Sequence, residues 1–276
     1  MTDYKLLLSD NGSKAPAATL MLRQLAARLG QRVGQPVDPV SMQHSDAIDP
    51  VELDGMPAEV LPAYLRRELD AGVRRFILLP LFFGVSRALT SYVPEHKAQL
   101  EQEFGVFDLE LAPVLHPRPD PEFSIAQIVL RQIERARQTV LSNSGQSAQR
   151  AVLVDHGTPV ERVNKVRREV ADWLQPRLDL PLDQACMERR EGAEYDFNGE
   201  LLEDWLRRQA ADGVRRVVVS MLFLLPGRHA GPGGDVVEIC QSVVDDYPDL
   251  QFEITPLVAE NEGIVDVLEQ RLRQVL

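Results

Sequence analysis

Two long stretches of the chain repeat one another. Residues 64–83 read YLRRELDAGVRRFILLPLFF and residues 205–224 read WLRRQAADGVRRVVVSMLFL, at an offset of 141 residues (205 − 64). Earlier in the chain Asp10 matches Asp155 at an offset of 145 residues (155 − 10), so the second copy is shorter between these points. A repeat on this scale indicates that the two halves fold alike.

Apolar runs alternate with helically spaced leucines within each copy. We therefore predict an α/β protein of two similar three-layer αβα modules, each with a mainly parallel four-stranded sheet. Gly30 and Gly72 are expected to end the first two helices. In the first copy the pattern predicts strands over 4–9, 36–42, 76–83 and 107–115 and helices over 15–30, 57–71, 93–104 and 121–141, and the second copy repeats this order from residue 151.

The module boundaries follow from a stretch without a periodic apolar face. Residues 141–150, LSNSGQSAQR, are rich in Ser, Gln and Gly, which is typical of a linker. We expect the first module at residues 1–141, the linker at 142–150 and the second module at 151–276.

Charge and composition exclude several classes of protein. A net charge of −12 argues against a nucleic-acid binder and against docking on anionic membranes. The longest apolar run, VVVSMLFLLP at 217–226, is too short to span a bilayer. Cys186 and Cys240 provide neither a disulfide framework nor a four-thiolate zinc site. The first residues, MTDYKLLLSD, lack the pattern of a signal peptide, so we expect a cytoplasmic protein.

The histidines gather where a parallel sheet places ligands. Four of the five follow predicted strands, and only one lies within a predicted helix: His44, His116, His156 and His229 against His96. Ligands of open α/β sheets bind outside the carboxyl ends of the strands. Their placement therefore marks this end of each sheet as the candidate site.

The second copy combines two imidazoles with a carboxylate. His156 follows the first strand, Glu188 ends the second, and His229 follows the third in a Gly-rich loop, LLPGRHAGPGG. Imidazole nitrogen is a good ligand for cobalt, nickel, iron or zinc, and it also accepts a proton near neutral pH. Two His and one Glu at one opening predict a divalent metal site with open coordination positions.

The first copy has lost these groups. The corresponding positions hold Asn11, Gln43 and Ala88, so all three potential ligands are replaced while neighbouring residues are kept. This pattern favours a loss of chemistry with retention of shape. The alternative is that His44 and His116 rebuild a different site in the first copy, although both are more typical of surface polar residues.

The motifs of the second copy resemble a known family. AVLVDHGT, the strand ending CME and VSMLFLLPGRHAGPGGD are similar to the sirohydrochlorin cobaltochelatase/ferrochelatase family, the class II tetrapyrrole chelatases of cobalamin and sirohaem synthesis. The resemblance implies a chelatase fold in tandem two-module form, with a tetrapyrrole held in a cleft between the modules. It also implies that His156 and His229 act as metal ligand and proton acceptor, with Glu188 as a third group.

The chain departs from the family pattern in two ways. Its first module lacks both histidines, and its second has a longer Gly/Pro loop, which moves Asp235 away from His229 in the sequence. We expect the imidazoles of His156 and His229 to face each other across an opening wide enough for a flat macrocycle.

Sirohydrochlorin is a polycarboxylate, so arginines near the site matter more than the overall charge. Guanidinium groups pair with carboxylates in a bidentate way. The nearest candidates for holding the substrate carboxylates are Arg189, Arg190 and Arg228 in the second copy and Arg87 in the first. Arg189 and Arg190 are also consistent with plain solvated charges, and Arg87 and Arg228 with a structural role shared by the repeat.

The resemblance implies an enzyme of the lyase class, a chelatase that inserts Co²⁺ or Fe²⁺, with Ni²⁺ as a further candidate, without ATP. It needs no organic cofactor, because the metal ion is a substrate. The expected partner is a tetrapyrrole and neither nucleic acid nor membrane, and the chain is expected to be a monomer with pseudo-two-fold symmetry or a homodimer. The alternative is a tetrapyrrole or metal carrier derived from the same family. A metal-dependent hydrolase is less favoured, because no nucleophile elbow is present.

Overall fold

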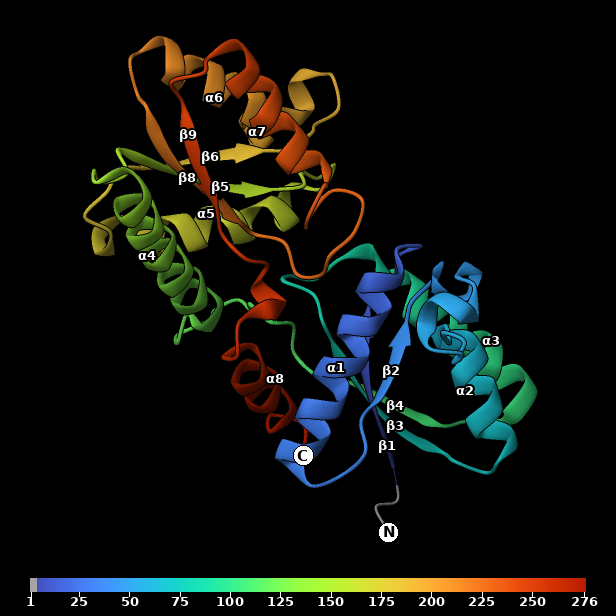
Figure 1. Cartoon of the computed structure of the whole chain (residues 1–276). Coiled ribbons are helices and arrows are strands. Elements are labelled where there is room, and N and C mark those ends of the chain that lie inside the picture. The colour runs from blue at the N-terminus through green and yellow to red at the C-terminus, as the bar shows by residue number, and fades with distance from the viewer. Residues whose placement is uncertain (1–3) are drawn as a thin grey trace. The chain divides into compact units, whose positions relative to one another are not determined.

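The computed structural model of the protein describes residues 4–276 (Figure 1). The chain forms two compact units. Unit 1 consists of the residues up to Asp120 together with Glu262–Leu276, and unit 2 consists of Pro121–Asn261. None of the helices in the described part of the chain is both long and apolar enough to cross a membrane.

Unit 1 is built on a parallel sheet with the strand order β2-β1-β3-β4. Helices α2 and α3 cover one face, where their apolar side chains form a core with the strands, and α1 and α8 pack together on the other. The strands are β1 (Lys5–Asp10), β2 (Asp38–Ser41), β3 (Arg75–Pro80) and β4 (Asp108–Leu111), and the helices are α1 (Pro16–Val33), α2 (Leu61–Asp70), α3 (Val93–Phe104) and α8 (Ile264–Leu272).

Unit 2 repeats this plan with one strand more. Its parallel sheet has the order β7-β6-β5-β8-β9, with α6 and α7 on one face and α4 and α5 on the other. The strands are β5 (Arg150–Asp155), β6 (Leu182–Cys186), β7 (Glu200–Leu201), β8 (Arg216–Met221) and β9 (Gln251–Ile254), and the helices are α4 (Ser124–Ser144), α5 (Glu161–Leu174), α6 (Leu202–Ala211) and α7 (Asp235–Asp246). The predicted α/β class with two parallel sheets is confirmed, and the two-residue β7 is the strand that the sequence did not predict.

The last helix of each sequence copy packs on the sheet of the other copy. Helix α4 packs on β8, β9 and α5 of unit 2, and Gln132 on α4 donates a hydrogen bond of 3.1 Å to the carbonyl of Leu257. Helix α8 packs on α1 and β3 of unit 1. The compact units therefore differ from the modules expected at 1–141 and 151–276, because each sheet buries the apolar face of a helix from the other copy. The observed linker is shorter than the one expected at 142–150. Helix α4 continues to Ser144 and β5 begins at Arg150, so residues 145–149 connect them.

The ends of the first two helices differ slightly from the prediction. Helix α1 continues past Gly30 to Val33, and Gly34 ends it in the left-handed conformation with φ 73°. The amide of Gly34 donates 2.9 Å to the carbonyl of Gly30, which is a common way to end a helix. Helix α2 begins at Leu61 rather than residue 57 and ends at Asp70, before Gly72.

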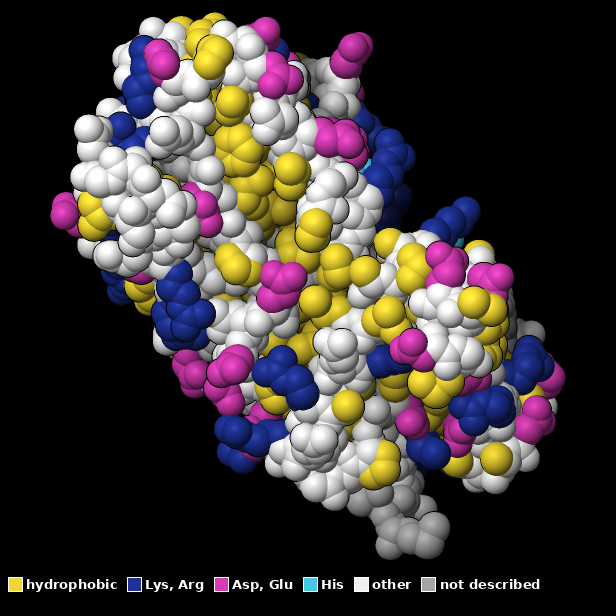
Figure 2. Space-filling view, in the orientation of Figure 1, with side chains coloured by type: hydrophobic (Ala, Val, Ile, Leu, Met, Phe, Trp, Pro, Cys, Tyr) yellow, Lys and Arg dark blue, Asp and Glu magenta, His cyan; other side chains and the backbone are white. Residues whose placement is uncertain are grey.

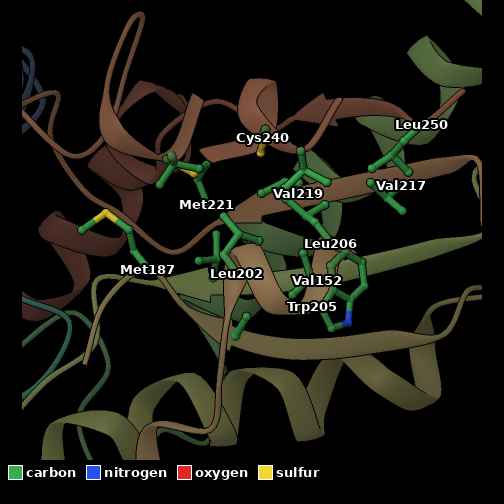
Figure 3. Packing of buried hydrophobic residues seen from close by; sticks show 14 of the residues in the cluster. Val152, Met187, Leu202, Trp205, Leu206, Val217, Val219, Met221, Cys240 and Leu250 are labelled. Carbon is green, nitrogen blue, oxygen red and sulfur yellow. The ribbon is translucent and has the colours of Figure 1, made fainter. Parts of the chain in front are cut away.

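Aliphatic strand residues and one indole form the core of unit 2. Figure 3 shows Val152, Val217 and Val219 beside Leu206 and Trp205 of α6. The Trp205 indole is fully buried and its Nε1–H donates 3.0 Å to Asp183 Oδ2, so its polar atom is satisfied.

Cys240 of α7 belongs to the same core, and it provides a test of that packing. Burial raises the pKa of its thiol to about 12. At pH 8 the thiolate is then only on the order of 10⁻⁴ of the population, and only the thiolate reacts with alkylating agents. We expect iodoacetamide to modify Cys240 at least ~10³-fold more slowly in the folded chain than in urea, as followed by peptide mass spectrometry. Equal rates in the two states would contradict the packing.

Candidate functional site

A glycine turn at the end of β5 places His156 against the segment that follows β6. Gly157 has φ 88°, and a Cβ at this position would lie 1.9 Å from the carbonyl oxygen of Glu188. Only glycine allows so close an approach. Two backbone hydrogen bonds hold the two segments together, from Met187 N to the carbonyl of Asp155 at 2.8 Å and from Glu188 N to that of His156 at 3.1 Å. His156 and Glu188 are neighbours for this reason.

The hydrogen bonds of His156 leave one ring nitrogen open. Its Nδ1 lies 3.1 Å from the carbonyl oxygen of Gly157, which can only accept, so Nδ1 carries a proton. Its Nε2 lies 3.3 Å from Glu188 Oε1. A bare nitrogen lone pair and a carboxylate do not attract each other, so this contact is favourable when a proton or another cation is present at Nε2.

His229 is held in the same manner by a carboxylate. Its Nδ1 lies 2.6 Å from Asp235 Oδ2, which leaves its Nε2 free. The loop brings the two together by folding back on itself, because Asp235 N donates 3.1 Å to the carbonyl of Arg228 and Val236 N donates 3.2 Å to that of His229. The longer Gly/Pro loop therefore does not separate Asp235 from His229, although the two are six positions apart in the chain.

The two imidazoles touch at the surface of unit 2. Their ring centroids are 4.5 Å apart at an interplanar angle of 80°, so no flat macrocycle fits between them, and the expected opening between the rings is wrong. The side chains of His156, His229 and Glu188 are 43%, 32% and 61% exposed. Among residues 4–276, however, no three His, Cys, Asp or Glu side chains are arranged to hold a metal ion. The three predicted ligands are thus neighbours without being a formed coordination shell.

The candidate arginines of unit 2 differ in the contacts that they already make within the protein. Arg189 donates to Asp196 Oδ1 at 3.2 Å and so braces the segment after β6. Arg190 lies 5.9 Å from the ring centre of Tyr195. Arg228 is 83% exposed, next to His229, with Nε 3.9 Å from Asp235. The guanidinium of Arg228 is therefore much more accessible to an anionic ligand than that of Arg189, whose side chain is 34% exposed.

Unit 1 keeps the shape of the turn without its reactive groups. Gly12 has φ 89°, and a Cβ there would lie 1.7 Å from the carbonyl oxygen of Gln43. Met42 N donates 2.9 Å to the carbonyl of Asp10, as Met187 N does to Asp155. The exposed side chain of Asn11 then stands where His156 does in unit 2.

The remaining candidate residues of unit 1 differ in how exposed they are. His44 is exposed, as expected, and has φ 71°. His116 is buried, so its expected surface position is wrong. The segment after β4 runs inward beside β3, where His116 Nδ1 lies 3.2 Å from Asp120 Oδ2, and Arg271 of α8 donates 3.3 Å to the other carboxylate oxygen. Arg87 is exposed at the start of a π-helical turn, Ala88–Tyr92.

One buried charge near the site escaped the sequence analysis. Burial raises the pKa of the Asp155 carboxyl above its usual value, and the guanidinium of Arg167, on α5, opposes this rise. Arg167 is itself buried. The repeat could have indicated Arg167, because the corresponding position of the first copy, 145 residues earlier, holds the apolar Leu22.

Two α/β units on parallel sheets, with two histidines and a glutamate beyond the strand ends of one of them, form a chelatase-like fold. The solved structures agree. Over 98% of its length the chain has the fold of SirB from Bacillus subtilis, solved with Fe³⁺, at 12% identity and a TM-score of 0.68, covering 94% of that chain. It also has the fold of CbiX, described as the terminal enzyme for biosynthesis of siroheme in denitrifying bacteria, at 18% identity and a TM-score of 0.64, covering 99% of both chains.

Sequence comparison adds a family. Residues 150–275 match the CbiX family model. The chloroplastic sirohydrochlorin ferrochelatase of Arabidopsis thaliana is 25% identical over 126 residues, which are 45% of this chain and 52% of that protein. The chain thus spans about half the length of this curated relative. Residues 150–275 thus match the CbiX family model, and the family resemblance that the motifs of the second copy indicate is confirmed over this stretch.

Asp10, in the unit that lacks the candidate ligands, allows a test of stability. Burial raises the pKa of Asp10 above its usual value, so its ionised form disfavours the folded state at neutral pH, and this cost disappears as the pH falls below the carboxyl pKa of the unfolded chain. We expect Asp10→Asn to raise the Tm at pH 7 and to leave it nearly unchanged near pH 3.5. Asp54→Asn, at an exposed position, is the matched control. An equal effect of Asp10→Asn at both pH values would contradict the assignment.

Proposed function

We propose that the chain inserts a divalent metal ion, Co²⁺ or Fe²⁺, into sirohydrochlorin without ATP. One observation supports this above the others. The Nδ1 atoms of both histidines are occupied by protein acceptors, the carbonyl of Gly157 and the carboxylate of Asp235. The two Nε2 atoms are therefore available together, on touching rings, beside the carboxylate of Glu188.

These groups suit an exchange of metal for protons. A free-base tetrapyrrole carries two inner N–H protons, and both must leave when a divalent cation enters. In our proposal His156, His229 and Glu188 hold the incoming ion, and the ring nitrogens replace them one at a time. As it loses the ion, Nε2 of His156 accepts one proton and the Glu188 carboxylate accepts the other, which solvent then removes from these exposed groups. General-base assistance of this kind contributes roughly 10²–10⁴-fold in rate.

The roles of the surrounding residues follow from their contacts. Asp235 fixes His229 with Nε2 outward, the arrangement by which a carboxylate orients and strengthens a histidine ligand. Arg228, exposed beside His229, and Arg190 are the candidates for the substrate carboxylates. Arg189 is occupied with Asp196 and serves the shape of the segment instead. Arg87, in unit 1, stays a prediction from the repeat.

A second candidate is a carrier that binds the tetrapyrrole or the ion without catalysis. The replacement of every candidate ligand in unit 1, by Asn11, Gln43 and Ala88, favours it. The two candidates differ in one measurement, because a carrier binds sirohydrochlorin while insertion proceeds at the uncatalysed rate.

The main test is insertion followed by visible absorbance with sirohydrochlorin and Co²⁺ or Fe²⁺, without nucleotide. We expect wild type to accelerate insertion and His156→Ala or His229→Ala to reduce the rate by about 10²-fold or more. Asn11→Ala removes the side chain at the corresponding position of unit 1 and is expected to keep the wild-type rate. Full activity of His156→Ala would refute the proposed mechanism, and binding without acceleration in wild type would favour the carrier.

The orientation of His229 has its own test. Asp235→Asn replaces the carboxylate that accepts from Nδ1, and changes to a group that orients a metal-binding histidine cost about 10- to 100-fold in metal affinity or activity. We expect a loss of this size in a Co²⁺ titration followed by the visible absorbance of the ion. Asp245→Asn, at an exposed position on the same helix, should leave the affinity unchanged, and an unchanged affinity in Asp235→Asn as well would show that the contact does not orient the histidine.

A further inference from the structure

A buried guanidinium lies directly behind the His156 turn. The side chain of Arg167, on α5, is 2% exposed. Its Nη1 donates to the Asp155 carboxylate and, at 2.7 Å, to the carbonyl of Ala185. Its Nη2 donates 2.5 Å to the carbonyl of Asn198. A buried charge is costly unless several acceptors surround it, and this one joins the ends of β5 and β6 to the segment that returns toward β7.

Asn198 completes the connection from the other side. Its side chain is fully buried. Its Oδ1 accepts from Thr158 N at 3.0 Å, and its Nδ2 donates 2.9 Å to the carbonyl of Thr158 and 3.1 Å to that of Tyr195. One amide therefore satisfies both backbone groups of Thr158, two residues after His156. We call Arg167 and Asn198 together the polar clamp.

The polar clamp acts on both segments that carry the candidate ligands. Asp155, which it holds by a charged hydrogen bond, accepts from Gly157 N at 3.1 Å and so fixes the turn around His156. Asn198 lies at the end of residues 188–198, the segment that begins with Glu188. The spacing between His156 Nε2 and the Glu188 carboxylate thus depends on contacts that neither residue makes itself.

Unit 1 shows that the fold does not require the polar clamp. Helices α1 and α5 begin at corresponding positions, Pro16 and Glu161, again 145 residues apart. In this register Leu22 replaces Arg167. Leu22 and Thr19 instead line a cavity of about 340 Å³. The same sheet and the same glycine turn therefore form with a cavity in this region, in the unit that also lacks the histidines.

The segment after β2 in unit 1 is held by a different arginine. Arg23 donates to the backbone carbonyls of Leu53, Met56 and Pro57 at 3.0, 2.8 and 3.1 Å. Its guanidinium donates to these three loop carbonyls rather than to Asp10, so it secures only the loop. Arg23 thus holds a loop through three acceptors, as Arg167 does, but has no connection to a candidate ligand, which makes it a suitable control.

We propose that Arg167 and Asn198 are positioning residues, which hold His156 and Glu188 at the spacing needed to share a cation. The inference rests on the proposed function, because it assigns the polar clamp to the site that handles the metal ion. Preorganisation of this kind saves the ion the cost of ordering its ligands. Arg167 is present in the unit that keeps the ligands, and Leu22 takes its place in the unit that has lost them.

The test compares Arg167→Leu, which installs the residue of unit 1, with Arg23→Leu. Each variant is studied below its own unfolding transition, with far-UV circular dichroism to confirm folding. We expect Arg167→Leu to weaken Co²⁺ binding by at least about 10-fold and Arg23→Leu to retain the wild-type affinity even where its Tm falls as far. Asn198→Ala should weaken binding as well, and the double variant should lose little more than Arg167→Leu, since both act through one turn.

A second readout separates this inference from the proposed function. The ¹⁵N chemical shifts of the His156 ring report its tautomer in the metal-free chain, and we expect them to change in Arg167→Leu and not in Arg23→Leu. Unchanged Co²⁺ affinity, or unchanged His156 shifts, in Arg167→Leu would overturn the positioning role. Absence of catalysed insertion in wild type would overturn the proposed function alone, because neither readout requires insertion.

Discussion

The backbone contact between the turn after the first strand and the segment after the second governs the rest of each unit. In unit 2 the carbonyl of Glu188 approaches Gly157 so closely that no Cβ fits. In unit 1 Gly12 and Gln43 make the same approach. This contact joins the carboxyl ends of neighbouring parallel strands, and any side chain that follows either strand is thereby brought to one place. The chemistry of a unit then depends on which side chains the sequence supplies there.

The two units carry different side chains on this shared contact. Unit 2 presents two imidazoles and supports them with charge, since Asp235 holds one ring and Arg167 balances Asp155 behind the other. In unit 1 the corresponding carboxylate, Asp10, is buried without an arginine partner in the described residues. Charged side chains of both signs are interspersed on the face drawn in Figure 2. Duplication has thus conserved a scaffold while its electrostatics diverged.

Sequence reasoning predicted the parts of this structure that follow from periodicity. Strands and helices alternate as expected, and His156, Glu188 and His229 meet because parallel strands end at one edge. The contacts that depend on distant residues were not predictable in this way. His116 is buried because α8, far along the chain, supplies Arg271 beside Asp120. The contact of Asp235 with His229 depends on how a glycine-rich loop folds back, which spacing alone does not determine.

The repeat also concealed which sheet each final helix covers, because α4 and α8 end their copies in the same way while packing on the opposite sheets. This exchange sets the order in which the two units can be completed during synthesis. As the chain leaves the ribosome, unit 2 has all its elements once residue 261 has emerged. Unit 1, although its sheet is synthesised first, waits for the last fifteen residues, Glu262–Leu276, to cover it. The sheet of unit 1 is therefore covered later than that of unit 2. A nascent chain that ended at residue 141 would already contain most of α4, which packs in unit 2, and would lack α8, which packs on the sheet of unit 1.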